Sequence, residues 1–163
     1  MVREFAISAG GITVAGATTL IFVNPPAAPN FALRFLRFWV GQSANATSAQ
    51  QRIELINKAS VFPTVTAATP TKLKVADPNV SIITGGTAGA IGTAGTNASA
   101  EGAGTATVHH DDTFNALNGW LFVPTPDETK EYPAGFGNGL GLYFPVAPAT
   151  LTNWAFGTHF AER

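Results

Sequence analysis

Four consecutive residues, His109, His110, Asp111 and Asp112, form the densest cluster of groups that could do chemistry. Imidazoles and carboxylates are ligands for metal ions, and copies of such a cluster around a symmetry axis could share one ion. Adjacent residues of a strand point to opposite faces, so His109 and His110 would not easily share one ion within a single chain. We therefore interpret the cluster as a solvated strand end or turn without a metal.

No other part of the sequence supports catalysis. There is no GxSxG, HExxH or P-loop pattern that would give His159 a nucleophile or a metal to act with. The glycine run Gly135–Gly141 lacks the strand-then-helix context of a phosphate site. Asp127, Glu128 and Glu131 are typical of the rim of a turn. We expect neither an enzyme nor a bound cofactor.

The composition indicates a surface that other protein covers. Only 12% of the 163 residues are charged, the net charge is −1, and 45% of the residues are hydrophobic. Such sparse charge is unusual for a free-standing monomer, because mixed surface charge keeps monomers apart. The chain also has no basic excess to neutralise a phosphate backbone, so we expect no nucleic-acid partner.

The only apolar stretch that resembles a targeting segment is residues 11–23. It is too short to span a bilayer and lacks the basic start and leucine-rich core of a signal peptide, so we expect no membrane partner. The absence of cysteine fits folding in a reducing cytoplasm.

Strands must position these residues, and the strongest strand signal is Phe31–Gln42. Apolar residues occupy both alternation phases, with Phe35 and Trp39 in one and Phe38 in the other. A strand of this kind is buried on both sides, by its own core and by a second sheet or a partner subunit. A helix is the alternative, since Phe31, Phe35 and Phe38 also recur at helical spacing. The aromatic content and the prolines upstream favour the strand.

Shorter Val/Thr-rich or alternating stretches predict further strands between Gly, Pro and Asn turns. Arg52–Ala59 is ambiguous, because Ser48 and Gln51 could cap a helix there, although the β-like surroundings favour a strand. The Asn-Gly pairs at 118–119 and 138–139 predict tight turns. The other predicted strands are residues 2–8, 12–15, 19–23, 61–70, 72–76, 80–84, 105–110, 140–144 and 150–160.

The stretch Gly85–Gly104 has glycine at a period of three over a short distance and no proline. This composition predicts a flexible loop rather than a collagen-like helix. The elements together predict one all-β domain over residues 1–163. It would be a jelly-roll-like β-sandwich with an N-terminal strand or arm region at 1–30 and a long Gly-rich loop at 85–104.

Two blocks of sequence carry a resemblance to a known family. RFLRFWVGQS at 34–43 is followed by HDDTFNALNGWLFVPTPDE at 110–128. A Gly-rich turn, an apolar strand ending in PVAP at 145–148 and a last strand closing on FAE at 160–162 complete the pattern. Over most of residues 31–163 the chain resembles the small β-rich proteins encoded among the head genes of tailed bacteriophages and prophages. Those with a known role are similar to capsid decoration (cement) proteins, typically trimers of jelly-roll-like subunits.

The resemblance implies a virion structural protein on the capsid surface, made in the host cytoplasm. It would form a homotrimer and clamp the major capsid protein, stabilising the assembled shell by mass action. The alternative is a fibre or tail-associated β-domain that binds host glycan through exposed Trp or Tyr. The candidates for the core or a subunit interface are aromatic residues: Phe31, Phe35, Phe38, Trp39, Trp120, Phe122, Trp154 and Phe156.

Overall fold

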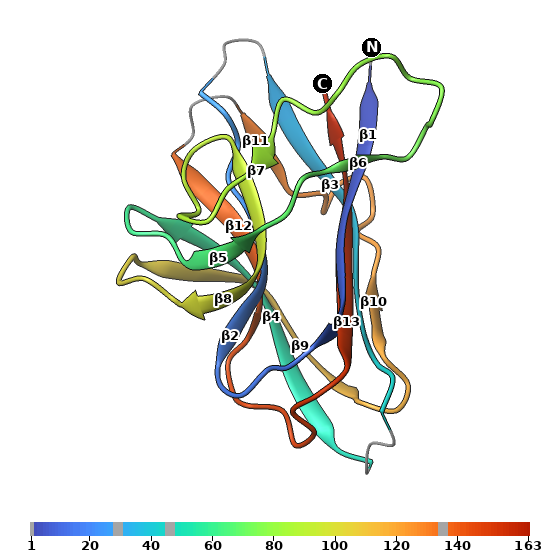
Figure 1. Cartoon of the computed structure of the whole chain (residues 1–163), viewed down its shortest axis with the longest axis vertical. Helices are drawn as coiled ribbons and strands as arrows, with labels where there is room; N and C mark the ends of the chain where they lie inside the picture. Colours follow the sequence, from blue (N-terminus) through green and yellow to red (C-terminus); the bar gives the residue numbers. More distant parts are fainter. Residues whose placement is uncertain (1, 28–30, 45–47, 134–136) are drawn as a thin grey trace.

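The computed structural model describes residues 2–27, 31–44, 48–133 and 137–163, which form two β-sheets packed together (Figure 1). These residues contain strands and no helix, and so no helix of the length and hydropathy needed to cross a membrane. The strands are β1 (Arg3–Ile12), β2 (Thr18–Val23), β3 (Ala32–Gln42), β4 (Gln50–Ala59), β5 (Thr64–Ala67), β6 (Thr71–Lys72), β7 (Thr84–Gly85), β8 (Thr93–Ala100), β9 (Ala106–Asn115), β10 (Trp120–Phe122), β11 (Glu131–Pro133), β12 (Asn138–Phe144) and β13 (Trp154–Glu162).

The first sheet, sheet A, has the strand order β10-β3-β13-β1-β6, and β11 also pairs with β3. The second, sheet B, has the order β5-β8-β2-β12-β4-β9, and β7 pairs with β8. The described pairs are antiparallel except for the short β7–β8 pair. The prediction of an all-β, sandwich-like fold is confirmed, as is the strand at Arg52–Ala59, which lies within β4.

The core between the sheets is dominated by aromatic rings from both. Trp154 of β13 meets Phe144 of β12 edge to face, with ring centroids 5.1 Å apart, and both side chains are fully buried. The indole nitrogen of Trp154 donates to the carbonyl of Thr150 at 2.7 Å. A buried indole needs such a partner, because an unpaired polar group in the core costs free energy.

Strand β3 has one core face in this structure. Leu33, Phe35, Phe38 and Val40 are buried, whereas Trp39 and its outward neighbours are half-buried or exposed on the outer side of sheet A. The strand itself is confirmed and the helix alternative is excluded. Burial of the second face by another sheet is wrong for the described chain, and its burial by a partner subunit stays a prediction.

A β-bulge explains why simple alternation fails in β3. The pairing with β13 skips Leu36, since Phe35 lies opposite Phe160 and the residue after Leu36 lies opposite His159. The extra residue turns Phe38 to the same face as Phe35. Their rings stack in the core with centroids 5.4 Å apart.

The strand that is buried on both faces is β2, not β3. Its outward Phe22 lies under the segment that connects β4 and β5, where the ring of Phe62 is 5.7 Å away. Glycine in β12 makes room for Phe22, because a Cβ on Gly139 would lie 2.2 Å from its ring. The turn predicted at Asn138-Gly139 is therefore wrong, since both residues lie inside β12.

The Gly-rich stretch is not a loop throughout. Thr93–Ala100 forms β8, which pairs with β2 on one side and β5 on the other. Gly95 permits a close approach to β5, because a Cβ there would lie 2.1 Å from Cγ2 of Val65. The prediction of a flexible loop over 85–104 is wrong for β8, whose backbone hydrogen bonds depend on strands distant in sequence.

A buried carboxylate holds the segment between β6 and β7 against the end of sheet A. Glu162 is fully buried, and its Oε1 accepts hydrogen bonds from Oγ of Ser81 at 2.5 Å and from the backbone N–H of Ile82 at 3.0 Å. Its Oε2 lies 3.3 Å from Nη2 of Arg3. Most of the strands predicted at 72–76 and 80–84 are therefore wrong: these partners fix an irregular segment instead.

Candidate functional site

Two features of the surface could bind a partner, and the first lies on the outer side of sheet A. We call it the Trp39 face and define it by Arg37, Trp39, Leu121, Gly157 and His159. Trp39 of β3 lies between Leu121 of β10 and Gly157 of β13 in the strand register. Leu121 is 63% exposed, so an apolar side chain stands open to solvent beside the indole.

The indole of Trp39 is held in one position by its neighbours. It covers Gly157, where a Cβ would lie 1.9 Å from Cζ2 of the indole. The ring of His159 meets it edge to face at 5.1 Å, and the guanidinium carbon of Arg37 lies 5.4 Å from its centroid. Nε of Arg37 also donates to Nδ1 of His159 at 3.1 Å. An aromatic side chain fixed in this way loses little entropy when it binds a partner.

We expect the stability of the fold to fall as the pH falls below about 6.5, the ordinary pKa of histidine. Burial and the charge of Arg37 lower the pKa of His159, and burial and Lys130 lower the pKa of His109. A lowered pKa means that the folded state binds the proton less tightly than the unfolded chain, so acid favours unfolding. Urea unfolding across this range checks the slope, which His159→Gln should reduce. An unchanged midpoint would contradict the expectation.

The His109–Asp112 cluster lies inside the exposed edge strand β9, so the prediction of a strand end or turn is wrong. Its two carboxylates are tied to other strands. Asp111 accepts from Nε and Nη2 of Arg52 at 2.8 and 2.6 Å, and Asp112 accepts from Nε1 of Trp120 at 2.9 Å. These hydrogen bonds lower the pKa of both acids. The acids therefore fasten β9 to its neighbours.

The two histidines do not simply alternate between faces. Leu55 of β4 lies opposite His110 and Ile56 lies opposite Val108, so His109 is the extra residue of a β-bulge. His109 and His110 consequently line the same cavity. No three His, Cys, Asp or Glu side chains within the described ranges are grouped so that they could hold a metal ion.

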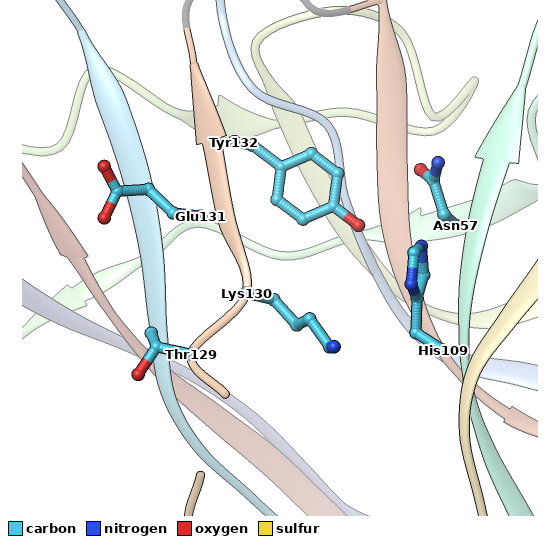
Figure 2. A pocket seen from close by; sticks show the side chains of 6 residues that line it. All are labelled: Asn57, His109, Thr129, Lys130, Glu131 and Tyr132. Carbon is cyan, nitrogen blue, oxygen red and sulfur yellow. The ribbon is translucent and has the colours of Figure 1, made fainter. Parts of the chain in front are cut away.

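The second surface feature lies between the edges of the two sheets, and we call it the edge cleft. It is a pocket of about 270 Å³ whose lining includes Asn57 of β4, His109 of β9, and Lys130 and Tyr132 at β11. Figure 2 shows Lys130 and Tyr132 extending toward Asn57 and His109 across the gap. Burial raises the pKa of the Tyr132 phenol, which therefore stays protonated near neutral pH.

The aromatic candidates lie in three kinds of position. Trp39 faces outward and Phe122 is partly buried against the core. The others are buried between the sheets: Phe31, Phe35, Phe38, Trp120, Trp154 and Phe156.

The sequence interpretation did not identify Asn57, Lys130 or Gly157 as surface-site residues. Lys130 and Asn57 line one pocket only because β11 of sheet A lies opposite β9 and β4 of sheet B, and no local pattern reports that arrangement. Gly157 carried a weak signal, because a glycine in an otherwise aromatic strand often marks the close approach of another group.

No protein-family model, curated protein or solved structure matches this chain. Its function is therefore inferred from the Trp39 face, the edge cleft and the resemblance carried by residues 31–163.

Proposed function

We propose that this chain is a virion structural protein, a decoration subunit that binds the major capsid protein of a phage head and stabilises the assembled shell. The Trp39 face is the observation that carries the proposal. Trp and Arg are the residues most enriched where protein interfaces concentrate their binding energy. Here both lie on an open sheet face, with Leu121 exposed beside them.

The surroundings of Trp39 favour a broad protein partner. The next strands present small side chains at the same level, since Ser8 of β1 pairs with Gly157 and Ala6 pairs with His159. A sheet face of small residues around one fixed indole is flat and can pack closely against another protein.

The outer face of sheet B is less suited to this role because the chain itself covers part of it. Phe22, Lys58 and Glu54 on that side are buried, and Glu101 accepts hydrogen bonds from Thr19 beneath it. These contacts leave sheet A as the sheet with the more open outer face. Binding through sheet A would direct the covered side of the sandwich away from the shell.

A jelly-roll-like arrangement and a homotrimer belong to the same proposal. The path of the chain supports the former, because β1, β2, β3 and β4 alternate between the two sheets, as do β12 and β13. The native mass of the purified protein tests the latter. A strict monomer in solution would count against trimerisation.

Trp39→Ala should strongly reduce shell stabilisation without unfolding the protein. The wild type is expected to add stoichiometrically to bare shells and raise their disruption temperature, and loss of an anchor tryptophan should weaken binding by about 2 kcal/mol, roughly 30-fold. Val75→Ala is the matched control, because Val75 is 91% exposed on the segment after β6, outside the Trp39 face. Equal stabilisation by Trp39→Ala and the wild type would exclude this face as the contact.

A second function is favoured by the same indole. A fixed tryptophan ring flanked by Arg37 and His159 could stack on a sugar and hydrogen-bond its hydroxyls, as a glycan-binding fibre or tail-associated domain would require. Signal on a glycan array that disappears in Trp39→Ala, together with no binding to shells, would support this function over decoration.

A further inference from the structure

We propose that the edge cleft binds a small hydroxylated carboxylate, of the kind found in acidic sugars. This inference concerns a different surface from the Trp39 face and does not depend on the capsid role. The cleft lies where the edge of sheet B, formed by β9 and β4, faces β11 of sheet A (Figure 2).

Three polar groups that converge on the cleft have no partner within the described part of the chain. Lys130 has no carboxylate within ion-pair distance, and the His109 ring makes no hydrogen bond. Oδ1 of Asn57 is buried and accepts no hydrogen bond. His109 is exposed and can be solvated, whereas Lys130 and Asn57 are half-buried and Oδ1 of Asn57 is fully covered. Covered polar groups are normally satisfied, so the unpaired Oδ1 beside Lys130 and His109 in one pocket indicates a ligand that supplies the missing partner. The β-bulge contributes, because it directs His109 into the cleft.

The charge inside the cleft favours an anion. Figure 2 shows Lys130 directed into the pocket. Glu131 also lines the pocket, but its carboxylate points to the other side of its strand and lies 3.8 Å from Nη1 of Arg163. Glu128 is held by its own turn, since it accepts a hydrogen bond from the hydroxyl of Thr125 at 2.9 Å. A carboxylate placed at Lys130 and His109 would accept charge-assisted hydrogen bonds.

Asn57 sets a second requirement on the ligand. Oδ1 of Asn57 is an acceptor and needs a donor, which a carboxylate lacks and a hydroxyl supplies. The pocket of about 270 Å³ lies below the usual range for drug-sized ligands and suits a single sugar ring. An adjoining cavity of about 330 Å³ shares His109 and Lys130 and also contains Asp127, whose charge disfavours a second acidic group there.

The test follows the His109 ring by NMR in the whole protein, with D-galacturonate as the probe. The ring signals are assigned from their loss in His109→Gln. Galacturonate is expected to shift them saturably, while D-galactose, which lacks the carboxylate, and acetate, which lacks the hydroxyls, bind at least about tenfold more weakly. Lys130→Gln should weaken galacturonate binding by about tenfold or more. The matched control Lys74→Gln should leave it unchanged, because Lys74 is exposed on the segment after β6 and does not line the pocket.

Three results would overturn the proposal. The first is no shift of the His109 signals up to about 50 mM galacturonate, a concentration at which a millimolar ligand would be near saturation. The second is an equal shift with galactose or acetate. The third is unchanged galacturonate binding in the Lys130→Gln variant. The rest of the spectrum shows whether each variant is folded. Shell binding by Lys130→Gln should equal that of the wild type, so failure here is distinguishable from failure of the decoration role.

Discussion

Phe38→Asp is expected to prevent folding, whereas substitution of Trp39, the next residue of β3, leaves the fold intact. Phe38 is 1% exposed and stacks on Phe35 in the core, while Trp39 lies on the outer side of the sheet. Truncating a buried phenylalanine to alanine costs about 3–5 kcal/mol. The aspartate adds an unpaired buried charge, which takes the loss to the scale of the whole stability of a domain.

The alanine variants make this comparison quantitative. Phe38→Ala should lower the free energy of unfolding by about 4 kcal/mol, and Trp39→Ala by about 1 kcal/mol, as measured by urea unfolding with far-UV circular dichroism. Equal losses for the two variants would mean that the bulge at Leu36 does not place Phe38 in the core. Loss of shell binding in Trp39→Ala but not in Phe38→Ala would show that one of these neighbouring residues serves binding and the other serves folding.

Glu162→Ala should be the most damaging removal of a charge in the chain. It would leave Arg3, which is 22% exposed, without its carboxylate partner, and the hydroxyl of Ser81 and the N–H of Ile82 without their acceptor. Breaking a buried pair in this way costs about 3–5 kcal/mol, because the remaining groups stay desolvated. Urea unfolding measures the loss.

Glu131→Ala is the matched control for that prediction. Its ion pair with Arg163 is at the surface, with both side chains more than 40% exposed, so the change should cost less than about 1 kcal/mol. Glu162→Gln keeps an acceptor for Ile82 and should lie between the two. Hydrogen exchange at the Ile82 amide should accelerate in Glu162→Ala. Protection equal to that of the wild type would show that Glu162 does not hold this segment.

The sequence was informative about local structure and much less so about which surfaces face each other. Val, Thr and aromatic enrichment with Gly, Pro and Asn breaks predicted the all-β class, and the β-like surroundings of Arg52–Ala59 favoured the strand that lies in β4. Alternation could not report the bulges at Leu36 and His109, because a bulge depends on the partner strand. Each bulge inverted an expectation, placing Phe38 in the core and His109 in the edge cleft.

The sequence also could not predict which residues are buried by segments distant in the chain. The strand buried on both faces is β2, since the chain after β4 returns over Phe22. Residues 20–23 are apolar in both alternation phases, but so is Phe31–Gln42, so the pattern alone does not report which of the two strands a distant segment covers. The sequence also did not indicate that Glu162 would be fully buried, because its partners are distant in sequence: Arg3 lies near the other end of the chain, and Ser81 and Ile82 lie in an irregular segment in the middle.

The position of β13 has a consequence for how the protein is made. It lies between β1 and β3 in sheet A, and Figure 1 shows it alongside β1, yet the ribosome synthesises it more than 100 residues after either neighbour. Until residue 162 has emerged, both neighbours lack their long partner, and the aromatic β3 has an unpaired edge. Pairing across such sequence separations is slow, and open apolar strands aggregate. Sheet A therefore closes only after translation of β13, and a chain cut short before it would be a target for chaperones and proteases.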